Sequence, residues 1–279
     1  MHQFIQGILL TVVITSFPNS KSIEEFGYSI EMLPWETVNE LIPNRSFFTI
    51  MDVETGKKFK VQRRAGSRHA DVQPITDNDT KIMKEIYNGK WDWKRKAIIV
   101  ISNARWIAAS MHGMPHGAGA LNNNFPGHFC VHFYGSTTHL TGKMDLSHKL
   151  MIYKAAGKLE DFINLGKPVD IVKAFVTGIK QQDADIMKNI STKQMDWSKV
   201  NEEIKNIRLT DINVVSELPF FHEFEIKLDW VSKDNHLESF VGKISIVRLS
   251  PIDPWRVDNE KLFRELGIFD PEQKRKLEL

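Results

Sequence analysis

Residues 128–133, with the sequence HFCVHF, alternate between two kinds of side chain. In a β-strand successive side chains point to opposite faces, so a period of two is typical of a strand. The phenylalanines and Val131 then share a face that suits a hydrophobic core, while His128, Cys130 and His132 share the other face. A core cysteine would more naturally lie with the apolar residues. The pattern therefore predicts a strand that presents a thiol between two imidazoles.

The composition is that of a folded protein without a basic excess. The chain has 279 residues, of which 42% are hydrophobic and 26% are charged, and this length accommodates two modest domains. Its net charge is +2, from 37 basic and 35 acidic residues, whereas nucleic-acid binding requires a concentrated basic face. We therefore expect no nucleic-acid partner. Cys130 is the only cysteine, which excludes an intrachain disulfide.

The N-terminal end carries an apolar run at residues 4–17, followed by small residues at Ser20 and Ser22. The run is shorter than the roughly 20 residues that span a bilayer, and its length suits the apolar part of a secretory signal. No Lys or Arg precedes it, and a buried strand or helix is the alternative. We predict a signal peptide or membrane anchor over residues 1–22, and hence a secreted or cell-envelope-associated, extracytoplasmic protein.

Residues 23–157 have the pattern of a mostly β domain. Short runs rich in β-branched and aromatic residues alternate with turn signals, and two segments with apolar residues four apart follow residues that can cap a helix. We expect strands at residues 47–53, 57–64, 97–102 and 105–111, and helices at residues 76–88 and 146–156. Asp145 most simply caps the second of these helices.

The pattern changes after residues 157–168, which we expect to join two domains. Val172, Phe175 and Ile179 lie on one helical face, and residues 224–230 then alternate as a strand does. Helices that are followed by antiparallel strands are typical of an α+β domain. The sequence therefore predicts a small second domain of that class after the junction.

This α+β domain is expected over residues 168–258. Its order of elements, ending in the sequence WRV at residues 255–257, resembles the cone-shaped folds of the SnoaL and nuclear-transport-factor group. The resemblance implies helices packed on a curved sheet and an accessory role in binding or positioning. Residues 259–279 are expected to form a C-terminal tail, in which residues 271–279, PEQKRKLEL, would be a frayed or surface helix.

The segment before the predicted strand can supply a base for the thiol. The thiolate is the nucleophile, so a thiol needs a base or a lowered pKa to attack at neutral pH. His116 precedes Cys130 by fourteen residues, in the loop sequence HGAG. Imidazole suits this role, and Gly117 and Gly119 allow the loop to approach the strand closely. Backbone N–H groups near Cys130 are the expected oxyanion donors. His112 is a rival base.

These residues resemble the catalytic motif of L,D-transpeptidases. That family carries a histidine-glycine pair, a spacer, and then Ser-His-Gly-Cys followed by an apolar residue and an Arg, His or Asn. Here His116-Gly117 matches the pair, and residues 127–132, GHFCVH, lie on the second block. The hairpin expected near residues 47–61 is also similar to the family's opening hairpin. The resemblance covers residues 47–150.

The resemblance implies that Cys130 is the nucleophile, His116 the general base and His128 the second histidine of the family's motif. The positions expected to contact the substrate are His132, Gly117, Phe129, His69 and Asp71. Gly127 replaces the family's serine, and Phe129 replaces a glycine that approaches the acyl group, which would reshape the oxyanion hole. The implied activity is acyl transfer on peptidoglycan stem peptides, by cross-linking or carboxypeptidase action, without a cofactor.

Two other functions remain open. His128, Cys130 and His132 have the side chains that zinc prefers, and His69 with Asp71 has a spacing similar to that of zinc peptidases acting on cell-wall peptides. These residues would suit a zinc-dependent peptidoglycan peptidase, although the paired His-x-His of such enzymes is missing. The second alternative is a non-catalytic cell-wall-binding module in which the cysteine is buried and inert.

Overall fold

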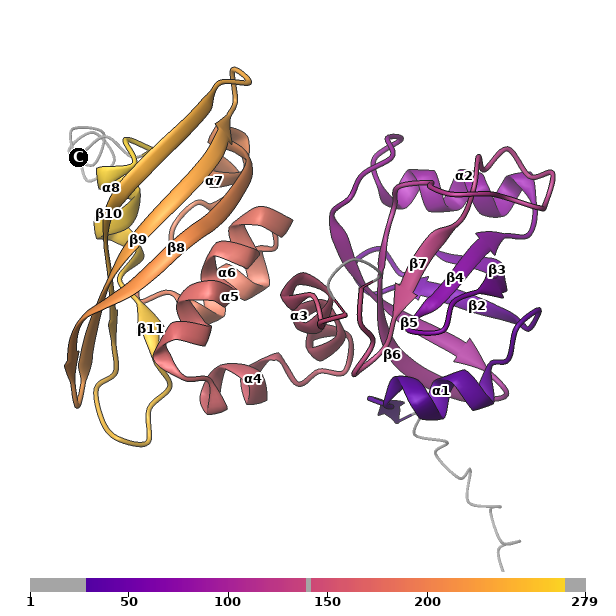
Figure 1. Ribbon diagram of the computed structural model, residues 1–279, viewed down its shortest axis with the longest axis horizontal. Coiled ribbons are helices and arrows are strands. Elements are labelled where there is room, and N and C mark those ends of the chain that lie inside the picture. The colour runs from indigo at the N-terminus through magenta and orange to yellow at the C-terminus, as the bar shows by residue number, and fades with distance from the viewer. Residues whose placement is uncertain (1–28, 139–141, 269–279) are drawn as a thin grey trace, which may run out of the picture.

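The computed structural model describes residues 29–138 and 142–268, which form two sheets with helices between and around them (Figure 1). The predicted signal peptide or anchor at residues 1–22 lies outside the described residues, as does the end of the predicted tail. In the described part of the chain, no helix is long and apolar enough to cross a membrane. The prediction of a mostly β first part followed by a part that combines helices and strands is confirmed at this coarse level.

The first sheet closes into a six-stranded barrel. Its strand order is β1-β6-β5-β2-β3-β4-β7, and β7 also pairs with β6, which completes the ring. All pairings are antiparallel except that of β1 (Ile30–Glu31), which adds to β6 in parallel. The barrel strands are β2 (Phe47–Asp52), β3 (Lys58–Ala65), β4 (Ala70–Pro74), β5 (Arg95–Ser102), β6 (Arg105–His112) and β7 (Phe129–His132). The closed ring leaves no edge among these six strands.

Apolar side chains fill the barrel. Every second residue of each strand points inward, and the interior is built from one cluster that includes Phe48, Phe59, Phe129 and Val131. Helices α1 (Trp35–Leu41) and α2 (Asp77–Ile86) lie at opposite ends of the barrel (Figure 1). The helix predicted from residue 76 is confirmed as α2. Thr76 and Asp79 form a reciprocal capping box at its start.

The second sheet is a half-barrel with antiparallel order β11-β10-β9-β8. Its strands are β8 (Ile204–Leu218), β9 (Phe221–Ser232), β10 (Leu237–Val247) and β11 (Arg256–Val257). Helices of this part are α4 (Leu159–Leu165), α5 (Pro168–Gln181), α6 (Ala184–Ile190), α7 (Trp197–Glu203) and α8 (Asn259–Glu265). The helix face predicted at Val172, Phe175 and Ile179 is buried in the core of this half-barrel unit.

Two helices at the edges of the second unit were not predicted. Leu262 and Phe263 of α8, at the start of the predicted C-terminal tail, are buried, and the Phe263 ring lies 5.9 Å from that of Phe175. Residues 159–165, expected within a junction, form helix α4.

Helix α3 (Leu146–Ala155) lies between the barrel and the half-barrel unit (Figure 1). Asp145 caps it as predicted, because its carboxylate accepts a hydrogen bond from the Ser147 N–H. The helix packs on small residues of the outer barrel wall, Ala97 and Ala108, and its apolar residues belong to the same cluster as those of α5. Helix α3 therefore covers part of the same outer wall that carries Cys130.

Candidate functional site

The thiol lies on the outer wall of the barrel, which is the strand face that points away from the interior. The predicted alternation holds, since Phe129 and Val131 are inside and Cys130 is outside. The pairing of β7 with the strands beside it then determines which residues lie next to Cys130. Asp71 of β4 pairs directly with Cys130, and the Cys130 N–H points at Nε2 of His112 on β6 at 3.4 Å. Closure of the barrel thus places a carboxylate and an imidazole on either side of the thiol.

The loop after β6 brings His116 to the sulfur. His116 and His128 form an isolated antiparallel bridge, with both backbone hydrogen bonds at 2.9 Å. His116 Nε2 then lies 3.3 Å from Cys130 Sγ. His116 Nδ1 lies 3.2 Å from the carbonyl oxygen of Met114, which can only accept, so Nδ1 carries the proton. The lone pair on Nε2 therefore faces the thiol, as a general base requires.

Two glycines permit this close packing. Gly117 has φ +61°, and a Cβ there would lie 2.3 Å from His128 Cε1. Gly127 has φ +123°, and a Cβ there would lie 2.5 Å from the carbonyl oxygen of His116. Any other residue would be strained and would push the loop off the strand. Gly117 therefore makes room for His128, and this packing contact differs from the substrate contact expected of Gly117.

Asp71 links the thiol to two more imidazoles. Its Oδ1 lies 3.7 Å from Cys130 Sγ, 3.2 Å from His69 Nε2 and 4.0 Å from His128 Nε2. The carboxylate is therefore within reach of a proton or cation held at any of these atoms. His69 and Asp71, identified in the sequence as possible substrate ligands, instead lie directly beside the predicted nucleophile.

A second row of polar side chains lies beneath α3. The His132 ring stacks between His69 and His148, with ring centroids 4.4 and 3.8 Å apart. His148 Nδ1 lies 3.0 Å from the Ser110 hydroxyl. Burial lowers the pKa of both His132 and His148 well below the usual value, so these rings are neutral. His148 was not among the residues predicted for the site, because no local signal in the sequence shows that α3 packs over β7.

Burial also decides the resting state of the thiol. Desolvation, followed by the negative charge of Asp71 and its hydrogen bond, raises the pKa of Cys130 above the ordinary range. The thiol is therefore protonated at rest, whereas the neighbouring imidazoles alone would suggest a thiolate. Burial lowers the pKa of His112 to about 2, so this ring is neutral and accepts at one nitrogen only, either the Cys130 N–H at Nε2 or the Met114 N–H at Nδ1. Proton transfer must accompany any attack by the sulfur.

The predicted site residues separate into two sets. Cys130, His116, His128 and Asp71 come together at one place on the outer wall. Three residues expected to contact a substrate have little or no surface: Phe129 is 0% exposed inside the barrel, His69 is 1% exposed and His132 is 3% exposed. Their side chains therefore shape or pack the site without facing a substrate. Phe129 and His132 were predicted from the motif resemblance and His69 from its spacing to Asp71, and neither kind of pattern carries information about burial.

Trp93 also lies at the site, although the sequence did not predict it there. Its ring lies 4.8 Å from that of His112 and 5.6 Å from that of His116. The indole is half exposed, so it forms part of the rim around the thiol. Trp91, its neighbour in the sequence, packs instead edge-on against Phe125.

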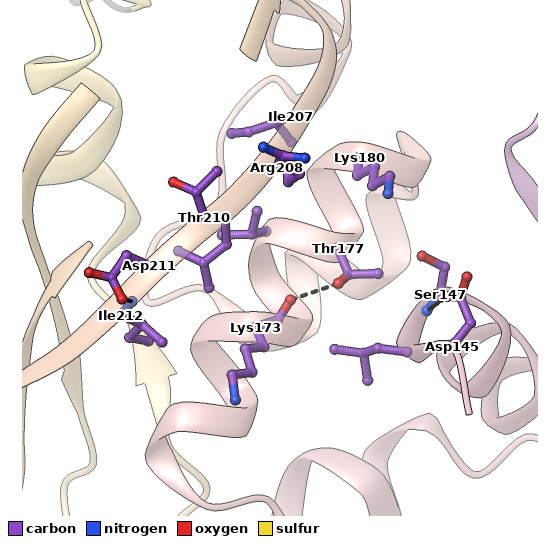
Figure 2. A pocket seen from close by; sticks show the side chains of 13 residues that line it. Asp145, Ser147, Lys173, Thr177, Lys180, Ile207, Arg208, Thr210, Asp211 and Ile212 are labelled. Carbon is purple, nitrogen blue, oxygen red and sulfur yellow. Dashed lines mark hydrogen bonds between the residues drawn. The ribbon is translucent and has the colours of Figure 1, made fainter. Parts of the chain in front are cut away.

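A separate cavity of about 450 Å³ lies between α3, α5 and β8 (Figure 2). Its rim carries Lys173 and Lys180 of α5 and Arg208 of β8. No residue of the thiol–imidazole cluster lines it. This cavity is therefore distinct from the place where Cys130 and its neighbouring imidazoles meet.

Comparison with known proteins assigns this chain to no family. No protein-family model matches the chain, and a search of curated proteins finds no match. The arrangement of Cys130 and its neighbours is therefore the observation that bears on function.

Proposed function

We propose that this protein is a cysteine-dependent acyltransferase that acts on peptidoglycan stem peptides, as its resemblance to L,D-transpeptidases implies. The observation that carries the proposal is the 3.3 Å separation of His116 Nε2 and Cys130 Sγ, with the proton of His116 held on Nδ1 by a backbone carbonyl. A nucleophile and an oriented base within hydrogen-bond reach are the signature of covalent acyl transfer. Nothing in this scheme requires a cofactor.

In the first step, His116 Nε2 takes the Cys130 proton while Sγ attacks the carbonyl carbon of the donor peptide bond. The tetrahedral intermediate then collapses, the C–N bond breaks, and the imidazolium gives its proton to the leaving amine, a terminal D-alanine. In the second step an amine of another stem peptide, or water, attacks the thioester. His116 removes the proton of that nucleophile and returns one to the sulfur, which restores the thiol.

The Cys130 N–H is the nearest candidate donor to the oxyanion. Its present acceptor is the neutral His112 imidazole, at a long 3.4 Å. A developing oxyanion is a stronger acceptor than a neutral ring nitrogen at that distance, so the donor gains by switching to it. This proposal assigns His112 a positioning role and leaves the base role to His116.

The finer fold assignments belong to the same proposal. The L,D-transpeptidase-like catalytic domain predicted over residues 23–157 would contain the barrel, and the SnoaL-like accessory domain predicted over residues 168–258 would contain the half-barrel. One feature supports this division: each sheet has its own buried apolar cluster. Helix α3 precedes residue 157 in the chain but packs in the second cluster, so it bridges the two parts. The substrate class further implies that the protein acts outside the cytoplasm.

Intact-mass spectrometry after exposure to a carbapenem, an acyl donor with a strained amide, tests the proposed function. We expect one covalent adduct on the full chain and none on Cys130→Ala. His116→Ala should slow adduct formation by about 10²–10⁴-fold, the usual contribution of a general base. His236→Ala, at an exposed site on the half-barrel unit, is the matched control and should react at the normal rate. An adduct that persists in Cys130→Ala would overturn the assignment.

A further inference from the structure

The cavity between α3, α5 and β8 follows the backbone edge of β8 (Figure 2). Six consecutive residues of β8, at positions 207–212, line it. Successive side chains of a strand point to opposite faces, so a cavity over one face of the sheet would meet only alternate residues. The uninterrupted run therefore places the cavity along the edge. β8 is the last strand of its sheet, with β9 as its only strand partner in the described part of the chain.

Side chains of β8 itself occupy two backbone donors beside this cavity. The Ile207 N–H donates to Asn206 Oδ1, and the Ile212 N–H donates to Asp211 Oδ1, each at 3.0 Å. In an edge strand, alternate N–H and C=O groups point away from the sheet and can pair with another chain. The two local bonds reach only the preceding residue, so an incoming strand can replace them without opening the sheet.

The opposite wall of the cavity is one face of α5. The α5 residues that line it are spaced three and four apart, as neighbours on one helix face are: Lys173, Val176, Thr177 and Lys180. The cavity is thus a groove between a strand edge and a helix, and its volume of about 450 Å³ is in the range of ligand pockets. An extended peptide that adds to a sheet edge places alternate side chains in such a pocket.

The charged groups along this groove favour an acidic occupant. Asp145 pairs with Arg95 at 2.9 Å, and both carboxylate oxygens of Asp211 accept hydrogen bonds from β8 itself. Within the described residues, no ion pair holds Lys173 or Lys180. The acidic side chains of the groove are therefore already engaged, whereas two ammonium groups are available to a ligand. Carboxylates of a bound chain would complement them.

We propose that β8 and α5 bind an extended acidic peptide segment of a partner protein, which adds to the half-barrel sheet as a further strand along residues 207–212. The peptide backbone pairs with the outer edge of β8, and its carboxylates meet Lys173 and Lys180. Arg208, which is 74% exposed and lies 3.6 Å from Asp229, adds a cation at the mouth. This recognition role is independent of the proposed acyl transfer, because no residue of the thiol–imidazole cluster lines the groove.

The test measures binding of a short fluorescein-labelled peptide, in which Glu and Val alternate, to the full chain by fluorescence anisotropy. We expect saturable binding of one peptide per chain, which weakens as salt is added because the charges are exposed. A peptide with Lys in place of Glu should bind far more weakly. No saturable binding by millimolar acidic peptide would overturn the proposal.

Backbone methylation separates strand pairing from attraction between charges. In an extended peptide the N–H groups of the Val residues point to one edge and those of the Glu residues to the other. Two peptides, methylated either on the Val nitrogens or on the Glu nitrogens, keep every charge. One should bind about 10-fold more weakly or worse, since several hydrogen bonds are lost, and the other should bind normally. Equal binding by both would overturn strand pairing.

Protein variants locate the groove. The double variant Lys173→Ala with Lys180→Ala should bind the acidic peptide about 5-fold more weakly or worse. Lys188→Ala, at an exposed lysine of α6 outside the groove, is the matched control. Cys130→Ala should bind normally, so binding stands or falls apart from the acyl transfer. Circular dichroism and melting temperature show that each variant is folded.

Two results with the protein would overturn the proposal. Normal binding by the folded double variant would show that the peptide lies elsewhere. Sedimentation of the chain without peptide tests the other occupant of an open edge, a second copy. A dimer that the acidic peptide dissociates would show that β8 pairs with another copy of this chain in place of a partner protein. We expect a monomer at the concentrations used for peptide binding.

Discussion

The barrel and the half-barrel unit bury polar groups in different ways. The interface of the outer barrel wall with α3 and with the loop that carries His116 and Gly117 buries hydrogen-bonding side chains, namely Ser110, His112 and His132 of the wall and His148 of α3. In the described part of the half-barrel unit, the two histidines, His222 and His236, are partly or fully exposed, and the helices pack on the sheet through aliphatic and aromatic residues. Buried polar groups stabilise little unless every partner is in place. Cys130 and its neighbouring imidazoles thus lie in a layer whose polar side chains stabilise the fold only where each has its hydrogen-bond partner.

Truncating a core side chain of the half-barrel unit should give the largest loss of unfolding free energy among these tests. It should also show most clearly whether the two units unfold independently. Phe175 is fully buried against Phe263, so Phe175→Ala should cost about 3–5 kcal/mol of unfolding free energy. Hydrogen exchange read by peptide should show lost protection in β9, with β2 and β3 unchanged. Equal loss of protection in the barrel strands would show that the two sheets unfold as one cooperative unit, and would contradict the distinction between the two units.

Acid should weaken the α3-covered layer specifically. The pKa of His148 is lowered by burial, and then by His132 and Arg95, below the value of about 6.5 expected in the unfolded chain. Its stabilising contribution is therefore complete above pH 6.5 and is lost as the pH falls, because the unfolded state binds the proton. Each pH unit below 6.5 over which the folded ring stays neutral removes about 1.4 kcal/mol of stability.

Urea unfolding at several pH values measures this loss, and exchange of α3 peptides locates it. His148→Gln keeps a hydrogen-bonding side chain but cannot take up a proton, so its stability should change less over the same range. A half-barrel sheet that loses protection at higher pH than α3 would contradict the assignment.

The smallest expected effect on stability tests the glycine loop. Gly117→Ala places a Cβ at φ +61° and 2.3 Å from His128 Cε1, and should cost about 1–2 kcal/mol from the backbone alone. Gly56→Ala is the matched control, since Gly56 has φ +67° with no atom within 4 Å of the added Cβ. Only Gly117→Ala should also slow reaction of Cys130 with iodoacetamide or a carbapenem, because it displaces the loop that carries His116. Equal reactivity in both variants would refute the packing role.

Local pattern predicted one strand of the site well. The period of two at residues 128–133 placed Cys130 opposite Phe129, and the glycines beside His116 indicated a loop able to reach the thiol. Both inferences need only neighbouring residues. The same reasoning anticipated the capped starts of α2 and α3, because a cap is also a local interaction.

The remaining contacts of the site depend on pairing between strands that are far apart in the sequence. Asp71 and His112 flank Cys130 only because β7 pairs with both β4 and β6, and a strand order is not written in any single segment. β8 escaped prediction because it is an edge strand whose residues are mostly exposed, so its sequence lacks the apolar alternation of a buried strand. The burial of His132 likewise depended on α3, which lies elsewhere in the chain.

The position of Cys130 on the strand that completes the ring has a consequence for how the chain matures. β7 is four residues long and joins partners distant in sequence, with Asp71 and Cys130 separated by 59 positions. Pairings across such spans form late, because their loop-closure entropy must be overcome before other contacts reward it. We therefore expect His116 and Asp71 to reach the sulfur only in the final folding step. A nascent or half-folded chain would carry an ordinary, unassisted thiol, and the competence to react would itself report that the barrel has closed.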